Sequence, residues 1–219
     1  MRTRLVHLAP FLIASSVVLM PGTAGAQRLG IVGGLNRAGI QGDAPLNTQY
    51  SGATGFLAGV VFEFSVAQDV FVSFQPQYAR RTTGIAFAIE GEEQPRDSLD
   101  VALSYVTLPV LAKVQALHGR TYVTGGFDVG MLLDAKLRGR GPDEDIKSVL
   151  NDLDVAALFG FGVVFPLGAP QLTVELRYSQ SLLNLSAGGM GLSGAALPDR
   201  FRAGGFQLLA GMLVRLGGR

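Results

Sequence analysis

Cysteine and tryptophan are absent from this chain of 219 residues, and only two histidines are present. Without cysteine, the chain can form neither a disulfide framework nor a lipid-anchored N-terminal cysteine. The formal net charge is only +1, whereas a nucleic-acid-binding domain normally carries a distinct basic surface. The composition therefore argues against a disulfide scaffold, a lipoprotein and a nucleic-acid-binding protein.

The N-terminal segment has the pattern of a secretory signal peptide. A positively charged start precedes an apolar run at residues 11–20, and the small residues that follow match a cleavage site between Ala26 and Gln27. We therefore expect residues 1–26 to be a signal peptide. Residues 27–219 then form one exported domain, a length that suits a single fold.

The two histidines offer little support for an enzyme. General acid–base catalysis most often uses histidine, but His7 lies in the predicted signal peptide and His118 in a short predicted turn. A single remaining histidine without cysteine also supplies too few ligands for a typical zinc site. We expect a non-enzymatic protein with no catalytic, cofactor-binding or metal-binding residues.

Eight strand-like runs fill the mature chain. They cover residues 28–37, 54–66, 70–83, 100–115, 120–136, 154–166, 171–183 and 203–216. The connections between them alternate strictly between long and short, and the first connection is long. Outer-membrane barrels have an even strand number, short periplasmic turns and long extracellular loops. The sequence therefore predicts an all-β fold, an eight-stranded antiparallel up-and-down transmembrane β-barrel with both ends of the domain in the periplasm.

One uncharged run, residues 155–174, is long enough to cross a membrane as a helix. Its centre, however, contains Pro166, Gly168 and Pro170, and proline cannot continue a helix while glycine favours turns. The run therefore predicts a strand, a tight turn and a second strand.

The strands have an apolar face and a polar face. Phe56, Val60 and Phe64 share one side of their strand, and the other strands show the same alternation. Six charged residues well inside strands lie on the opposite side: Glu63, Lys113, Asp128, Glu175, Arg177 and Arg215. This pattern is typical of a barrel with an apolar outer face and a polar lumen. Arg80 lies on the apolar side, at a strand end from which it can reach lipid headgroups.

The six inward charges predict an ionic layer in the lumen. Strand direction places most of them near the periplasmic end, with Asp128 somewhat higher, and Gln75 and Gln77 join them from the third strand. Isolated charges in a narrow lumen would be costly, whereas paired and hydrogen-bonded charges are tolerable. We therefore expect these side chains to plug the barrel.

Several segments in order resemble the PorT-like outer-membrane β-barrel family. The segments are residues 29–36 (LGIVGGLN), 55–59 (GFLAG), 71–78 (FVSFQPQY), 105–113 (YVTLPVLAK) and 176–178 (LRY) with Leu182 and Asn184. The likeness covers nearly all of the mature chain. It implies an integral outer-membrane barrel, and some members of that family serve protein-secretion systems.

We expect a structural or interaction role in a Gram-negative envelope, exerted through exposed loops or the periplasmic face. A narrow channel or transporter for small or apolar molecules is one alternative, although an eight-stranded lumen holds only side chains or one small ligand. A soluble periplasmic lipocalin-like ligand-binding barrel is another. The expected partners are outer-membrane lipid, the barrel-assembly machinery during insertion, and envelope or secretion proteins, with no nucleic acid.

Overall fold

The computed structural model describes residues 27–41, 48–87, 97–138, 143–183 and 202–216. The predicted signal peptide, residues 1–26 with the cleavage residue Ala26, lies outside the described residues. Gln27, on the other side of the predicted cleavage site, is the first residue of the first strand.

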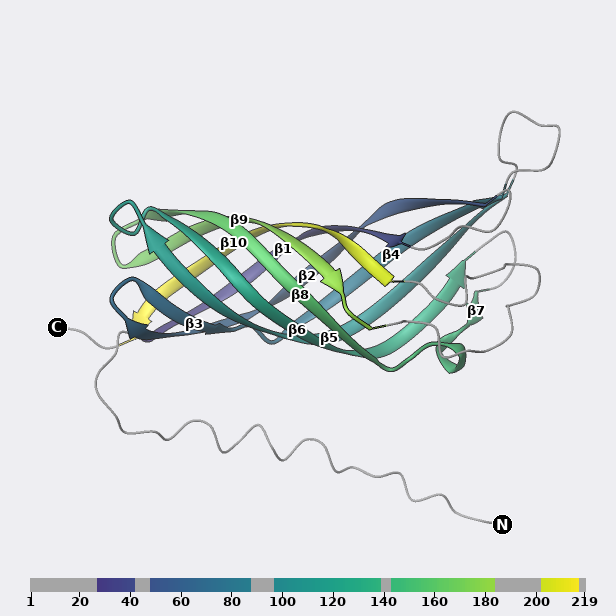
Figure 1. Ribbon diagram of the computed structural model, residues 1–219, viewed down its shortest axis with the longest axis horizontal. Helices are drawn as coiled ribbons and strands as arrows, with labels where there is room; N and C mark the ends of the chain where they lie inside the picture. Colours follow the sequence, from purple (N-terminus) through teal and green to yellow (C-terminus); the bar gives the residue numbers. More distant parts are fainter. Residues whose placement is uncertain (1–26, 42–47, 88–96, 139–142, 184–201, 217–219) are drawn as a thin grey trace, which may run out of the picture.

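The described chain forms a closed ring of tilted antiparallel strands (Figure 1). The strands are β1 (Gln27–Gln41), β2 (Thr48–Ala67), β3 (Val70–Phe74), β4 (Gln77–Phe87), β5 (Asp97–Ala116), β6 (Thr121–Arg138), β7 (Glu144–Asp145), β8 (Leu153–Pro166), β9 (Pro170–Ser181) and β10 (Arg202–Leu216). A short 3₁₀ helix, η1 (Lys147–Val149), follows β7. Strand β1 pairs with both β2 and β10, so the sheet has no open edge between its first and last strands.

The third crossing of the barrel consists of β3 and β4, which are separated by Gln75 and Pro76. Proline has no N–H to donate, so it interrupts the hydrogen-bond ladder at this point. Both strands nevertheless keep one register against β2, because Phe74 pairs with Phe62 and Gln77 pairs with Gly59. The predicted strand 70–83 is thus a single crossing, and the ring has eight crossings in an up-and-down order.

The described short turns, residues 68–69, 117–120 and 167–169, lie at one end of the barrel, and the strand ends that border the predicted long connections lie at the other (Figure 1). The predicted long connection 137–153 contains structure that the sequence did not indicate. Strand β7 pairs with β6, and the buried Ile146 donates its N–H to the carbonyl of Ala135 at 3.0 Å. A two-residue strand is too short to leave a periodic pattern, which explains why it was missed.

The outer face of the barrel is apolar. Val129 is 46 % exposed and Phe206 57 % exposed, and large aliphatic side chains continue around the ring. Aromatic rings gather near both ends of this belt: Phe62, Phe64 and Phe165 at the short-turn end, and Phe56, Tyr78 and Phe206 at the other. A soluble lipocalin-like barrel would turn polar side chains outward, so this face contradicts that alternative.

Among the described residues, no helix is long and apolar enough to cross a membrane. The uncharged run 155–174 divides between β8 and β9, as predicted, and a turn around Gly168 joins them. Gly168 has φ of +88°, a backbone conformation that glycine adopts without a steric penalty.

Candidate functional site: two ionic clusters in the lumen

The inner face of the barrel buries eight charged side chains. They are Arg28, Glu63, Arg81, Lys113, Asp128, Asp154, Glu175 and Arg177. Four are basic and four are acidic, so the set is neutral overall when all are ionised. Their ion pairs form three groups, and Tyr122, which contacts both Lys113 and Glu175, links two of these groups. We call the linked groups the periplasmic cluster (Arg28, Glu63, Lys113, Glu175 and Arg177) and the third group the outer cluster (Arg81, Asp128 and Asp154).

Glu63 is the first centre of the periplasmic cluster. Its carboxylate accepts a hydrogen bond from Lys113 Nζ at 2.8 Å and pairs with Arg28 Nη1 at 3.4 Å. Both cations also lie over aromatic rings, since Lys113 Nζ is 4.1 Å from the centroid of Tyr122 and the Arg28 guanidinium is 4.1 Å from that of Phe71. The Glu63 carboxylate and the rings of Tyr122 and Phe71 thus stabilise two cations that are buried from bulk solvent.

Glu175 is the second centre of the periplasmic cluster. Arg177 Nε donates to its carboxylate at 2.8 Å, and the hydroxyls of Tyr122 and Thr124 donate to it at 3.0 and 3.1 Å. Arg177, which is 1 % exposed, also donates through Nη2 to Gln75 Oε1 at 3.0 Å. Because one carboxylate collects three donors, it keeps hydrogen bonds even if one donor is lost.

Glycines on β8 create the room for this arrangement. Gly160 pairs with Arg177 and Gly162 with Glu175, and both glycines face the lumen. A Cβ at Gly160 would lie 2.5 Å from the hydroxyl of Thr124, and one at Gly162 would overlap the ring of Tyr122. The missing side chains on β8 therefore let groups from β6 and β9 meet.

The outer cluster depends on one cation. Arg81 Nη1 donates to Asp154 at 2.7 Å, and Nη2 lies 3.6 Å from Asp128. The hydroxyl of Ser181 also donates to Asp154, and the guanidinium lies 5.0 Å from the ring centroid of Tyr105. A single planar guanidinium thus bridges two buried carboxylates.

In the structure, the predicted site residues do not form a single layer. Glu63, Lys113, Glu175 and Arg177 meet in the periplasmic cluster, and Gln75 joins them. Asp128, in contrast, lies in the outer cluster, and Gln77 donates to Thr107 instead of a charged group. The prediction for Arg215 needs correction, because this side chain, opposite Arg28 near the end of β10, is exposed and forms no ion pair with a described residue.

Sequence reasoning missed Arg28, Arg81 and Asp154. Each lies on the inner side of its strand by simple alternation: Arg28 precedes outward Leu29, and Arg81 follows outward Arg80. They were overlooked because they stand near expected strand ends, and the real strands extend further. The face pattern applied to the terminal residues would have found all three.

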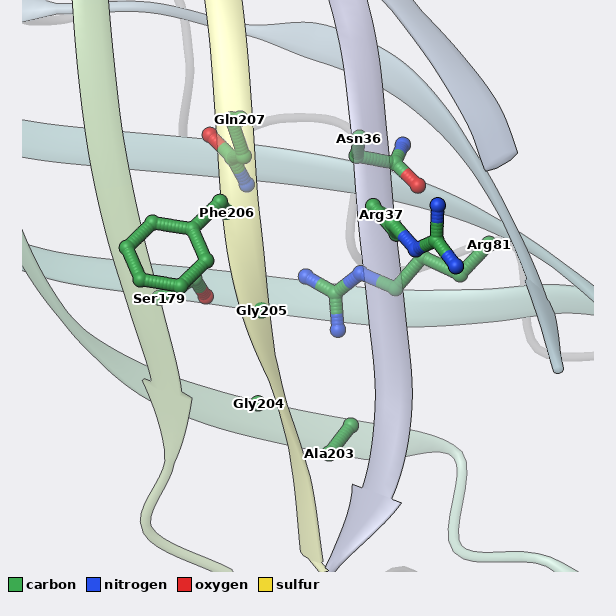
Figure 2. Close-up of a pocket in the computed structure, with 9 residues that line it drawn as sticks. All are labelled: Asn36, Arg37, Arg81, Ser179, Ala203, Gly204, Gly205, Phe206 and Gln207. Atoms are coloured by element: carbon green, nitrogen blue, oxygen red, sulfur yellow. The ribbon is translucent and has the colours of Figure 1, made fainter. Parts of the chain in front are cut away.

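Little space remains between these side chains. A cavity of about 20 Å³ adjoins the periplasmic cluster beside Tyr122 and Lys113, and one of about 10 Å³ lies beside Arg81 and Gln207 (Figure 2). Cavities of this size hold about one water molecule each. These two cavities therefore admit a water molecule beside the clusters but no larger solute.

Comparison with solved structures finds barrels of similar extent but low identity. The Ail protein of Yersinia pestis, in complex with the heparin analogue sucrose octasulfate, is 16 % identical, with a TM-score of 0.45, and the match covers 85 % of this chain and 98 % of that chain. OprG of Pseudomonas aeruginosa is 13 % identical, with a TM-score of 0.45 and coverage of 89 % and 98 %. The Neisserial surface protein A is 12 % identical, with a TM-score of 0.45 and coverage of 86 % and 97 %.

The sequence of the chain also matches a family model. A search of curated proteins finds no match. The model of the outer membrane protein beta-barrel domain, however, matches residues 24–187, which is most of the chain. Together with the closed ring of eight crossings and the apolar outer belt, this match shows that the chain belongs to the outer membrane protein beta-barrel domain family and resides in the bacterial outer membrane.

Proposed function

We propose that the protein is a non-conducting and non-enzymatic barrel with a structural or interaction role in the bacterial envelope. The observation that carries this proposal is the double closure of the lumen by the two ionic clusters. The eight charged side chains come from seven different strands, so they tie opposite walls of the barrel together. A solute would have to break buried ion pairs at two levels, which costs several kcal/mol for each pair.

Conductance separates this role from that of a narrow channel. Purified protein is inserted into planar bilayers at moderate salt, and we expect no steady single-channel steps. A control variant with Glu63, Lys113, Glu175 and Arg177 all replaced by serine removes most of the periplasmic cluster, and heat-modifiable gel mobility verifies its folding. Steady steps from the unmodified protein would establish the channel alternative and overturn the proposal.

The proposed partners are outer-membrane lipid, the barrel-assembly machinery during insertion, and envelope or secretion proteins. The resemblance of residues 29–36 and 105–113 to the PorT-like family supports the secretion-associated form of this role. Affinity capture of the tagged protein from its native envelope, after mild crosslinking, tests it. We expect a reproducible envelope or secretion protein that is absent from capture with an unrelated eight-stranded barrel; capture of lipid alone would contradict a protein partner.

A further inference from the structure

Two arginines on the outer face of the barrel have no carboxylate partner among the described residues. Arg37 of β1 and Arg80 of β4 both alternate with the lumen-facing residues of their strands, and no described acidic group pairs with either. Two other outward cations, in contrast, have carboxylate partners. Lys136 pairs with Asp134 at 3.6 Å, and Arg138 pairs with Asp143 at 3.3 Å.

Both arginines lie at the outer edge of the apolar belt. Along β1, outward residues from Leu29 to Leu35 precede Arg37, and a tilted strand of this length rises about 20 Å, close to the thickness of the belt. In the sheet register Arg37 lies opposite Phe206, and Arg80 lies opposite Phe56. These aromatic side chains mark the headgroup boundary, so the two cations face the headgroup region of the outer leaflet.

Glycines form the strand positions beyond Arg37. Gly39 pairs with Gly204 on β10, and a Cβ built on Gly39 would lie 3.9 Å from the Cα of Gly52 on β2. Three adjacent strands thus carry glycine just beyond Arg37 on its extracellular side. Figure 2 shows Arg37 on β1 and Phe206 on β10, with Gly204 further along β10.

We propose that Arg37 and Arg80 bind the phosphorylated headgroup of an outer-leaflet glycolipid, which lies beside the half-buried Gly39 and Gly52. One strand, β2, separates the two arginines, and Arg37 lies opposite its Thr54 whereas Arg80 lies opposite its Phe56. Their Cα atoms are therefore about 12 Å apart, and both side chains can reach one headgroup. A guanidinium binds phosphate through two parallel hydrogen bonds. Phe56 and Phe206 lie where the acyl chains of the same lipid begin.

Lipid retention tests this site. The full chain in detergent is mixed with bis-phosphorylated lipid A or with the same lipid after phosphatase treatment, and native mass spectrometry measures the bound fraction. We expect one tightly retained lipid A and little retention of the dephosphorylated form. Each arginine near the membrane surface contributes about fivefold, so Arg37→Gln with Arg80→Gln should weaken retention about thirtyfold.

Two further variants distinguish this site from general charge attraction. The matched control, Lys136→Gln with Arg138→Gln, removes two paired outward cations and should leave retention unchanged. Gly39→Leu keeps both arginines but covers the glycine surface, and it should also weaken retention. Gel mobility shows that each variant is folded. Equal retention by the Arg37/Arg80 variant and the control variant, or equal binding of phosphorylated and dephosphorylated lipid, would overturn the proposal.

Discussion

The outer cluster holds two buried carboxylates with one guanidinium and one hydroxyl donor, whereas the periplasmic cluster holds two carboxylates with three cations and two hydroxyl donors. In the outer cluster, Arg81 is the only cation among the described residues, and its removal leaves Asp154 with the Ser181 hydroxyl alone. In the periplasmic cluster, Glu175 retains Tyr122 and Thr124 when Arg177 is removed. We therefore expect the number of donors around each carboxylate, more than the number of charges, to determine how each cluster responds to mutation.

The largest effect is expected for Arg81→Met, which leaves Asp128 and Asp154 buried without a cation. Removing one partner of a buried ion pair costs about 3–5 kcal/mol, so the free energy of unfolding should fall by about that amount. Urea titration in lipid vesicles, followed by gel mobility, measures the change. Adding Asp128→Asn and Asp154→Asn to the variant should restore part of the loss; no recovery would show that Arg81 stabilises the barrel through packing alone.

The second-largest effect is expected on the outer face of β6, on the opposite side of the barrel wall from Asp128. Val129 directly follows Asp128 on β6 but faces outward. We expect Val129→Arg to cost about 2–4 kcal/mol, since it places a charge near the middle of the bilayer. Phe62→Arg, near the periplasmic boundary, should cost less. The same titration ranks the two variants, and a larger loss at Phe62 would contradict the assigned depths.

A smaller effect is expected for Arg177→Met. The carboxylate of Glu175 keeps two hydroxyl donors, so the loss approximates that of one hydrogen bond to a charged group, about 2 kcal/mol. Measured beside Arg81→Met, this variant tests the comparison directly. Equal losses for the two arginines would mean that the extra donors around Glu175 do not compensate.

The smallest effect is expected for a variant that fills the space left by a glycine on β8. Gly162→Ala should push the ring of Tyr122 away from Glu175 and cost about 1–2 kcal/mol, as overpacking commonly does. Gly125→Ala is the matched control, because its Cβ would meet the Phe159 ring at an ordinary 3.8 Å. If both variants unfold at the same urea concentration, the glycine on β8 is not needed for the periplasmic cluster.

Alternation of apolar and charged residues predicted most of the architecture, including all eight crossings and the inward direction of Glu63, Lys113 and Glu175. The grouping of those charges could not be predicted, because it depends on the register between strands and on the tilt of the sheet. Asp128 shows the difference: its face follows from sequence, but its pairing with Arg81 follows from the position of β4 across the lumen. The small β7–η1 element had no periodic signal at all.

The sequence separation of the ion pairs bears on how the barrel forms. Glu63 and Lys113 are 50 residues apart, Arg81 and Asp154 are 73 apart, and Arg177 and Gln75 are 102 apart. Contacts of such long range form late, after the chain entropy of large loops has been lost. Until these contacts form, each charge remains hydrated. The hydrated inner face of a partly assembled sheet therefore opposes early closure of the ring. The arrangement that closes the finished lumen therefore also makes closure of the ring a late and cooperative event.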